Sequence, residues 1–286
     1  MTEEAAVRYR DLDLWPPREV LEALYEGQLR ALAAVHRALP HLEGAAREAA
    51  ERLKGGGSLA YAGAGTSGRL AAMDGVELWP TFGFSRVRFL LAGGEAGLTR
   101  AVEEAEDREE EGFRLGQGLE AEDVLVAVAA SGRTPFTLGA LRGAKARGAL
   151  TVALANNPGA PLLQEAHHPV LLDTGPEVIA GSTRLGAGTA QKAALNLFST
   201  LVMVLLGRTY GNLMARMRVE NAKLRARGAA MVRAMVGLGE EEAKALLARY
   251  PEPALAALAA LGKTGEEAER LLEARGVRGA LEEARR

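Results

Sequence analysis

The sequence contains no cysteine, so the protein can form no disulfide, thiolate metal site or thiol nucleophile. It also has no excess of basic residues, because 35 Lys and Arg are set against 37 Asp and Glu, a formal net charge of −2. Proteins that bind nucleic acids or membrane surfaces through charge carry a clear excess of positive charge. We therefore expect neither nucleic acid nor a membrane among its partners.

Long apolar runs are also absent. The longest, residues 197–206, is interrupted by Ser199 and Thr200 and is too short to span a bilayer. The first six residues have neither the basic nor the apolar region of a secretory signal. These features predict a cytoplasmic protein. Its 286 residues, 48% of them hydrophobic, suffice for one α/β domain with a small appendage.

A glycine-rich loop at residues 61–69, Tyr-Ala-Gly-Ala-Gly-Thr-Ser-Gly-Arg, is the most informative stretch of the chain. It follows a short apolar run and opens a helical stretch. Its three glycines permit a tight turn and close backbone approach, while Thr66 and Ser67 place hydroxyls at the helix N-terminus. Unpaired N–H groups at such a terminus favour the binding of an anion. The loop therefore predicts a phosphate site.

The Gly-x-Gly-x-x-Gly spacing of this loop also occurs in dinucleotide-binding proteins. Those proteins carry an acidic residue roughly 20 residues further on, at the end of the second strand, to hold the ribose. Here the second apolar run ends in two glycines, and Glu95 comes late for that role. The lysine of a Walker loop is absent after the last glycine. A sugar phosphate is the favoured ligand, and a purely structural turn is the alternative.

Five short apolar runs alternate with longer helical stretches. The runs are 59–62, 87–92, 124–129, 150–155 and 170–172. This alternation predicts an α/β fold with a doubly wound, five-stranded parallel sheet, in which ligands bind beyond the carboxyl ends of the strands. A second hydroxyl-rich turn with Ser131, Gly132 and Thr134 follows the third run, so we expect it to lie beside the first loop and to bind the same phosphate.

Helical patterns account for most of the remaining chain. The expected helices cover 18–53, divided in two at Pro40, then 190–206, about 210–235, 240–250, 252–261 and 264–274. The expected domains are an N-terminal arm with helices at 1–46, a phosphosugar-binding domain at 47–235 and a three-helix domain at 236–286. Gln191 and Lys192 fall in the first turn of one expected helix, where they can face the pocket mouth or only solvent.

Together these motifs resemble the sugar isomerase (SIS) domain, and more narrowly the N-acetylmuramic acid 6-phosphate etherases. The resemblance runs over residues 50–230, approximately, and rests on many ordered blocks. The blocks are 63–70, 80–83, 92–94, 101–107, 130–135, 175–178, 181–184, 187–192 and 210–213, with 262–268 in the tail.

The resemblance implies removal of the D-lactyl ether from the sugar by elimination and then hydration, leaving N-acetylglucosamine 6-phosphate and D-lactate. No metal or other cofactor is implied. It places the catalytic acid at Glu77 and the base at Glu106. The implied phosphate-binding residues are Thr66, Ser67, Gly68, Ser131, Gly132 and Thr134. Further substrate-binding residues are Arg69, Ser182, Thr183, Gln191 and Lys192.

The residues themselves support these catalytic roles to different degrees. A proton next to an aldehyde needs a positioned base and an ether leaving group needs an acid, so two carboxyls suffice. Glu106 lies in the acidic stretch 103–111, where a solvated helix face is the ordinary interpretation and Asp107 is an equal candidate. A helix from Ser67 to Glu77 would put that carboxylate about 15 Å from the phosphate loop. We therefore expect a homodimer with shared active sites.

Three positions depart from the family pattern. Bulky Leu78 and Trp79 follow Glu77, and Gly186 replaces a lysine. Two other functions remain open on the sequence, namely a different phosphosugar isomerase and a non-catalytic phosphosugar-binding regulator. A basic DNA-reading head, which would favour a transcription factor, is absent from the first 50 residues.

Overall fold

The computed structural model describes residues 1–100 and 102–286; Ala101, the first residue of one motif block, lies outside the described residues. The chain forms two compact units. The first comprises Met1–Gly75 and Arg86–Ser199, and the second comprises Val76–Ser85 and Thr200–Arg286. The domain boundaries expected from the sequence stay predictions.

The first unit is built on a parallel sheet of five strands, which confirms the predicted fold class. The strands are β1 (Leu59–Gly63), β2 (Val87–Leu91), β3 (Val124–Val128), β4 (Leu150–Ala155) and β5 (His168–Leu171). Every residue of β1, β3 and β4 is buried, which explains why these strands read as continuous apolar runs.

The strand order is β2-β1-β3-β4-β5. From β1 the chain moves outward to β2 and then returns to the other side of β1 to form β3. The loops that follow β1 and β3 therefore diverge from neighbouring strand ends. In doubly wound sheets this switch point is the usual place for a ligand.

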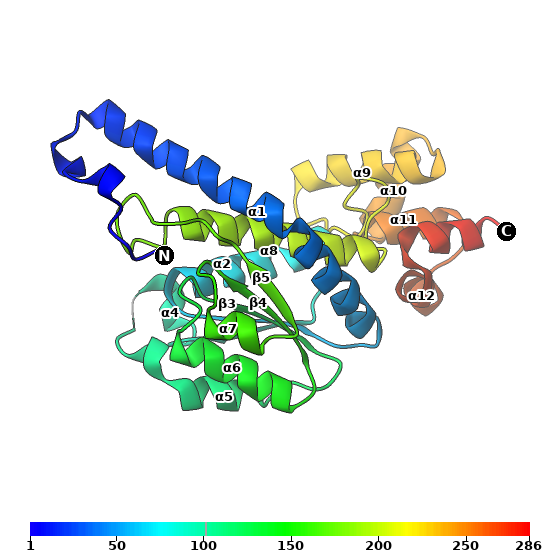
Figure 1. Cartoon of the computed structure of the whole chain (residues 1–286). Helices are drawn as coiled ribbons and strands as arrows, with labels where there is room; N and C mark the ends of the chain where they lie inside the picture. Colours follow the sequence, from blue (N-terminus) through cyan, green and yellow to red (C-terminus); the bar gives the residue numbers. More distant parts are fainter. Residues whose placement is uncertain (101) are drawn as a thin grey trace. The chain divides into compact units, whose positions relative to one another are not determined.

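Helices cover both faces of the sheet (Figure 1). One face carries α1 (Pro17–Lys54), α2 (Gly65–Val76) and α8 (Gly186–Leu205), and the other carries α5 (Glu109–Gly116), α6 (Pro135–Ala146) and α7 (Pro161–Glu165). Short elements fill the connections, namely η1 (Val7–Tyr9), η2 (Leu12–Leu14), α4 (Ala96–Thr99) and η3 (Ala105–Asp107). An apolar core lies between β1, β3, β4 and the helices α6 and α7.

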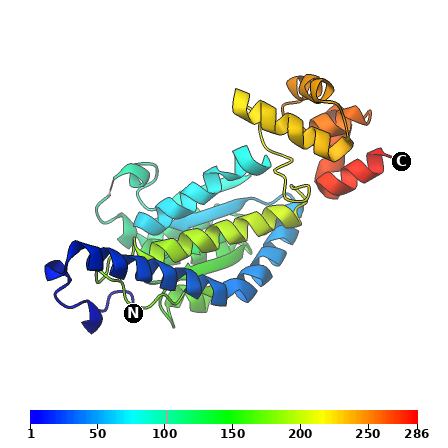
Figure 2. The ribbon, with the colours of Figure 1, turned by 90° about the horizontal axis from the view of Figure 1, so that it is seen from above.

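The predicted division of the first helical region at Pro40 is wrong, because α1 is one helix of 38 residues with Pro40 inside it. The same face of α1 stays buried on both sides of the proline, through Ala34 and Ala38 before it and Leu42 and Ala45 after it. The stability that α1 gains by packing on the sheet thus outweighs the destabilisation that the proline causes within the helix. The helix bends along its length instead of ending (Figure 2), and an internal proline is a usual cause of such a bend.

The helix predicted to begin at residue 190 begins earlier, at Gly186. The carboxylate of the buried Glu177 accepts hydrogen bonds from the N–H groups of Gly186 (2.9 Å) and Ala187 (2.8 Å) and so caps α8. Gln191 and Lys192 consequently lie in the second turn, not in the first as expected.

The second unit contains α3 (Leu78–Phe82), α9 (Ala222–Val236), α10 (Glu240–Arg249), α11 (Pro253–Ala260) and α12 (Gly265–Ala284). The helix expected from about residue 210 starts only at Ala222, because Asn221 caps it and Tyr210 pairs with Leu213 in an isolated bridge. The third tail helix is longer than predicted. It continues to Ala284 past a kink at Gly276, whose φ is +65°.

Among the described residues, no helix has both the length and the apolar character that a bilayer span requires.

Candidate functional site

A cavity of about 460 Å³ opens beside the loops that follow β1 and β3, within the first unit. Its volume lies in the usual range for small-molecule sites. The residues that line it are Glu3, Ala64, Gly65, Thr66, Ser67, Glu106, Asp107, Ala129, Ala130, Ser131, Arg133, Thr134, Pro135, Gly181 and Thr183. The two predicted hydroxyl-rich loops and one predicted catalytic carboxylate thus share one cavity.

The loop after β1 owes its shape to its glycines. Gly63 and Gly68 lie so close that a Cβ on either would come within 2.9 Å of the other's backbone, and Gly65 has a φ of +53°. The first intrahelical bond runs from the Gly68 N–H to the Ala64 carbonyl. The N–H groups of Thr66 and Ser67 therefore precede the helical ladder of α2 and can bind an anion.

The loop after β3 has a similar construction. Gly132 has a φ of +64°, and a Cβ there would lie 2.5 Å from the Cβ of Ala160. The N–H of Arg133 donates to Ser131 Oγ (3.2 Å), which leaves the Ser131 hydroxyl proton available to a ligand. Thr134 is the N-cap residue of α6, and the next residue, Pro135, begins the helix. Two helix N-termini thus border the same cavity.

Glu106 lies in the 3-10 turn η3 and not on the face of a long helix. Glu104, which has a φ of +55°, turns the chain immediately before η3 begins. The side chains of Glu106 and Asp107 are both exposed, and both residues line the cavity. The structure therefore keeps Asp107 beside Glu106 as a second carboxylate at the site.

Two charged lining residues, Glu3 and Arg133, were not singled out as site residues by the sequence. Arg133 lies within the predicted loop, and its exposed guanidinium is the nearest cation in sequence to the hydroxyls. Glu3 is separated from every motif by more than 50 residues of chain, so no local signal in the sequence pointed to it.

Other predicted residues lie outside the cavity lining. Arg69 Nε donates to the carbonyl of Gly97 (3.0 Å), so it ties α2 to the segment after β2. Gln191 is buried and donates to Asn156 Oδ1 (2.9 Å). Lys192 is exposed, and Ser182 precedes the lining residue Thr183.

Gly68 and Gly132 also lie outside the lining and act through the backbone shape of their loops.

Glu77 belongs to the second unit and lies between α2 and α3. Its side chain is exposed, whereas the next residue, Leu78, is buried. Arg218 stacks on the ring of Trp79 in the same unit, with the guanidinium carbon 4.5 Å from the ring centroid. The cavity thus brings together the hydroxyls predicted to bind phosphate, Thr183 and Glu106, and Glu77 is not among its lining residues.

A buried polar network holds α2 in place behind the phosphate loop. Asp74 accepts hydrogen bonds from the Tyr61 hydroxyl (2.7 Å), Asn196 Nδ2 (2.6 Å) and Ser199 Oγ (3.0 Å). Burial of the Tyr61 phenol, and then the neighbouring Asp74 carboxylate, raise the pKa of Tyr61 well above its usual value. Within the described residues, no three His, Asp or Glu side chains gather as a metal site requires.

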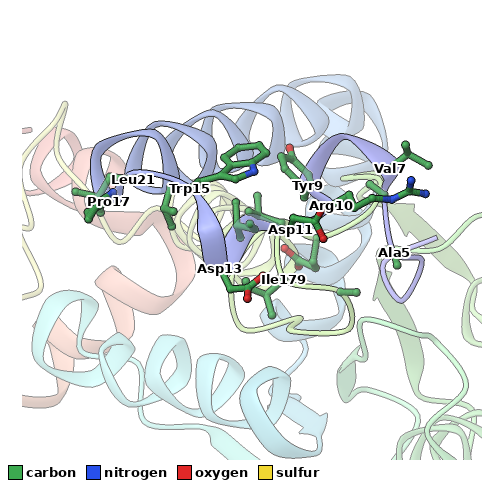
Figure 3. A pocket seen from close by; sticks show the side chains of 16 residues that line it. Ala5, Val7, Tyr9, Arg10, Asp11, Asp13, Trp15, Pro17, Leu21 and Ile179 are labelled. Atoms are coloured by element: carbon green, nitrogen blue, oxygen red, sulfur yellow. The ribbon is translucent and has the colours of Figure 1, made fainter.

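A larger hollow of about 960 Å³ lies between the N-terminal arm, the start of α1 and residues 177–180 (Figure 3). Its wall is mostly apolar and includes Leu12, Trp15, Val20 and Ile179. It has no counterpart of the paired hydroxyl loops, so the smaller cavity is the better candidate for a phosphorylated ligand.

Comparisons with known proteins support the fold class. A model of the glucokinase regulatory protein N-terminal SIS domain matches residues 42–145, and the SIS domain model matches residues 98–205. Among solved structures, the C-terminal domain of glucosamine-fructose-6-phosphate aminotransferase from Francisella tularensis aligns with a TM-score of 0.50 at 19% identity. That alignment covers 72% of this chain and 52% of the other, and it shows a shared fold.

Full-length relatives are much more similar. The N-acetylmuramic acid 6-phosphate etherase of Deinococcus radiodurans is 50% identical over 281 residues, which is 96% of this chain and 92% of the relative. That of Rubrobacter xylanophilus is 46% identical over 294 residues, with 100% of this chain and 97% of the relative covered. At such identity over nearly the whole length, the chain belongs to the N-acetylmuramic acid 6-phosphate etherase family.

Proposed function

We propose that this protein cleaves the D-lactyl ether of N-acetylmuramic acid 6-phosphate, giving N-acetylglucosamine 6-phosphate and D-lactate. The observation that most directly supports this proposal is the cavity at the switch point of the sheet. Two hydroxyl-bearing loops and the carboxylate of Glu106 line that cavity. The family membership supports the choice of reaction over other phosphosugar chemistry.

The phosphate end of the substrate binds the two loops. Donors come from the hydroxyls of Thr66, Ser67, Ser131 and Thr134 and from N–H groups at the starts of α2 and α6. Gly68 and Gly132 contribute by letting the backbone reach the shapes described above. Thr183, in the segment that leads into α8, contacts the sugar. The substrate-binding roles expected of Arg69, Ser182, Gln191 and Lys192 stay predictions, because these residues do not line the cavity.

Elimination requires a base at C2 and an acid at the ether oxygen on C3. In the open-chain sugar the aldehyde acidifies the C2 proton, which the Glu106 carboxylate removes, and the C3–O bond then breaks as the lactate oxygen is protonated. Water adds across the resulting double bond and restores the C3 hydroxyl. Glu106 suits the first step because it is exposed to the same cavity as the phosphate-binding hydroxyls.

We assign the acid to Glu77 of a partner subunit. Glu77 lies after the end of α2, and this 12-residue helix extends about 18 Å from the phosphate loop. A single hexose phosphate does not span that length. In a homodimer with shared active sites, Glu77 of one subunit would serve the phosphate loop of the other.

The outer face of α1 supports such a dimer. Large apolar side chains recur there at helical spacing and are strongly exposed, namely Leu21 (67%), Tyr25 (65%), Leu29 (49%), Leu32 (48%) and Leu39 (40%). We call these five residues the α1 stripe. Contiguous exposed apolar surface of this kind marks protein interfaces. A second copy of the chain is the proposed occupant.

The proposed setting is the cytoplasm, where the reaction would serve amino sugar catabolism and peptidoglycan recycling. A sugar phosphate is an intracellular metabolite by its chemistry, because its charge prevents passive passage through a bilayer.

The decisive experiment is incubation of the protein with N-acetylmuramic acid 6-phosphate, with released D-lactate measured enzymatically. We expect lactate release that falls at least 100-fold in Glu106→Gln, because removing a general base costs about that much. Asp107→Asn is the matched control, and we expect it to retain more activity. Release of no lactate by the wild type would contradict the proposal, and interconversion of hexose phosphates instead would favour an isomerase.

A further inference from the structure

The first residues of the chain are anchored beside the candidate site. Thr2 is fully buried, and its N–H donates to Asn157 Oδ1 (3.0 Å). Its carbonyl accepts from the N–H groups of Glu177 (3.4 Å) and Gly181 (3.3 Å). Asn157 Nδ2 in turn donates to Thr2 Oγ1 (3.2 Å). Chain ends without such ties are poorly ordered, so these bonds give the segment a defined position.

These bonds connect the segment to two elements of the sheet unit. Asn157 is the second residue after β4, while Glu177 and Gly181 belong to the segment that leads into α8. Figure 1 shows the N-terminus lying beside that segment. Residues 1–4, which we call the N-terminal strap, therefore reach the carboxyl ends of the strands, where the cavity opens.

Glu3 follows the buried Thr2 and lines the cavity together with Gly181 and Thr183. Its side chain is exposed to that space, and its carboxylate takes part in no hydrogen bond or ion pair within residues 1–100 and 102–286. In contrast, the neighbouring Glu4 lies outside the lining and pairs with the terminal amine of Met1 (2.5 Å). The carboxylate of Glu3 is thus available to a ligand.

The chemistry of a carboxylate limits what Glu3 can bind. An ionised carboxylate only accepts hydrogen bonds and repels a phosphate, so it cannot serve the phosphate end of the substrate. The remaining part of an amino sugar offers hydroxyl and amide N–H donors, which a carboxylate binds strongly. Glu106 is already assigned to proton transfer, and Glu3 comes from an independent segment.

We infer that Glu3 is a specificity-determining residue that accepts a hydrogen bond from a hydroxyl or amide N–H of the bound sugar, presented by the N-terminal strap. This inference rests on the proposed site and adds a contact that none of the sequence motifs contains. The strap supplies the position through Thr2, and Glu3 supplies the acceptor.

The test compares Glu3→Ala and Glu3→Gln with the matched control Glu4→Gln, using lactate release from N-acetylmuramic acid 6-phosphate. We expect KM to rise about tenfold or more in Glu3→Ala, with a smaller change in kcat, because a hydrogen bond to a charged group is lost. Glu3→Gln retains an acceptor oxygen, so we expect a smaller rise. Glu4→Gln is expected to match the wild type, and circular dichroism checks that each variant is folded.

Direct binding of inorganic phosphate, measured by calorimetry, separates the two ends of the site. The dissociation constant for phosphate is expected to stay unchanged in Glu3→Ala and to rise in Ser67→Ala, since only the latter removes a phosphate donor. An unchanged or lower KM in Glu3→Ala, or tighter phosphate binding in that variant, would overturn the inference, because the carboxylate would then only repel anions.

A wild type without lactate release would refute the proposed reaction and leave this inference testable. Binding of N-acetylglucosamine 6-phosphate, measured by calorimetry, then replaces the kinetic assay. About tenfold weaker binding to Glu3→Ala than to Glu4→Gln supports the sugar contact, and equal binding contradicts it.

Discussion

Asp74 illustrates how single residues support the site from behind. It is a buried carboxylate, 4% exposed, and it receives donors from β1 and from two positions on α8. Buried carboxylates are stable only when they are satisfied in this way. Because Asp74 lies on α2, the same bonds hold the helix whose first turn carries Thr66 and Ser67.

Replacing Tyr61 by Phe removes one donor from this network. We expect the free energy of unfolding to fall by about 1.5–3 kcal/mol, because the lost hydrogen bond involves a buried charged group. Chemical denaturation followed by circular dichroism measures the change. Tyr250→Phe is the control, since within the described residues the Tyr250 hydroxyl makes no hydrogen bond, and we expect it to change stability little.

The raised pKa of Tyr61 adds a pH dependence to the same comparison. Above about pH 10 the phenol loses its proton in the unfolded chain but keeps it in the folded protein, so stability falls as pH rises from 10 toward the folded-state pKa. Below pH 10 this contribution is fully present. The stability difference between wild type and Tyr61→Phe should therefore shrink at alkaline pH. A difference that stays constant would argue against a buried, protonated phenol.

Among the elements, α5 and α6 are packed backbone against backbone. Gly112 and Gly116 on α5 face Gly139 and Gly143 on α6, and a Cβ on any of them would lie 2.0–2.2 Å from a carbonyl oxygen of the other helix. Both pairs have the spacing Gly-x-x-x-Gly, which places small residues on one helix face. This contact fixes α6, whose N-cap residue Thr134 borders the cavity.

We expect Gly139→Ala to lower the free energy of unfolding by about 1–3 kcal/mol, because the added methyl group forces the two helices apart. The control is Gly44→Ala on α1, where a Cβ meets no atom within 4 Å. Alanine there should stabilise the helix by about 0.5–1 kcal/mol. Thermal unfolding of both variants gives the comparison. Equal effects at the two positions would show that helix propensity, and not close packing, governs Gly139.

The elements also show where sequence patterns succeed. The apolar runs at 59–62 and 124–129 predicted β1 and β3 closely, because strands buried on both faces leave little room for polar residues. The division at Pro40 and the start of α8 were predicted wrongly. In both cases a contact distant in sequence decided the outcome, through burial along α1 and through the carboxylate of Glu177.

For the whole molecule, the proposed sharing of active sites predicts complementation between inactive subunits. Glu77→Gln and Ser67→Ala chains, each inactive alone, should recover activity when unfolded together and refolded. A mixed dimer then holds one intact site of its two, so random pairing should restore about a quarter of wild-type activity. Lactate release measures the recovery, and no recovery would place Glu77 and Ser67 of one chain in the same site.

The α1 stripe supplies the control for this experiment. Tyr25→Glu with Leu29→Glu puts two charges on the proposed interface, and we expect this variant to be monomeric by light scattering and to lose complementation. Phe113→Glu changes an exposed apolar residue on α5 and should leave the dimer intact. A wild type that is itself monomeric would contradict the shared site.

The sequence by itself determined the parallel sheet, the family and the two loops that bear Ser67 and Ser131, because burial, turns and helix starts leave local patterns along the chain. Only the tertiary structure decided which distant residues meet. Glu3 and Thr183 line one cavity with Glu106 because the strand order β2-β1-β3-β4-β5 and the bonds of Thr2 bring their segments together. Such proximity depends on long-range packing, which leaves no periodic signal near any one of these residues.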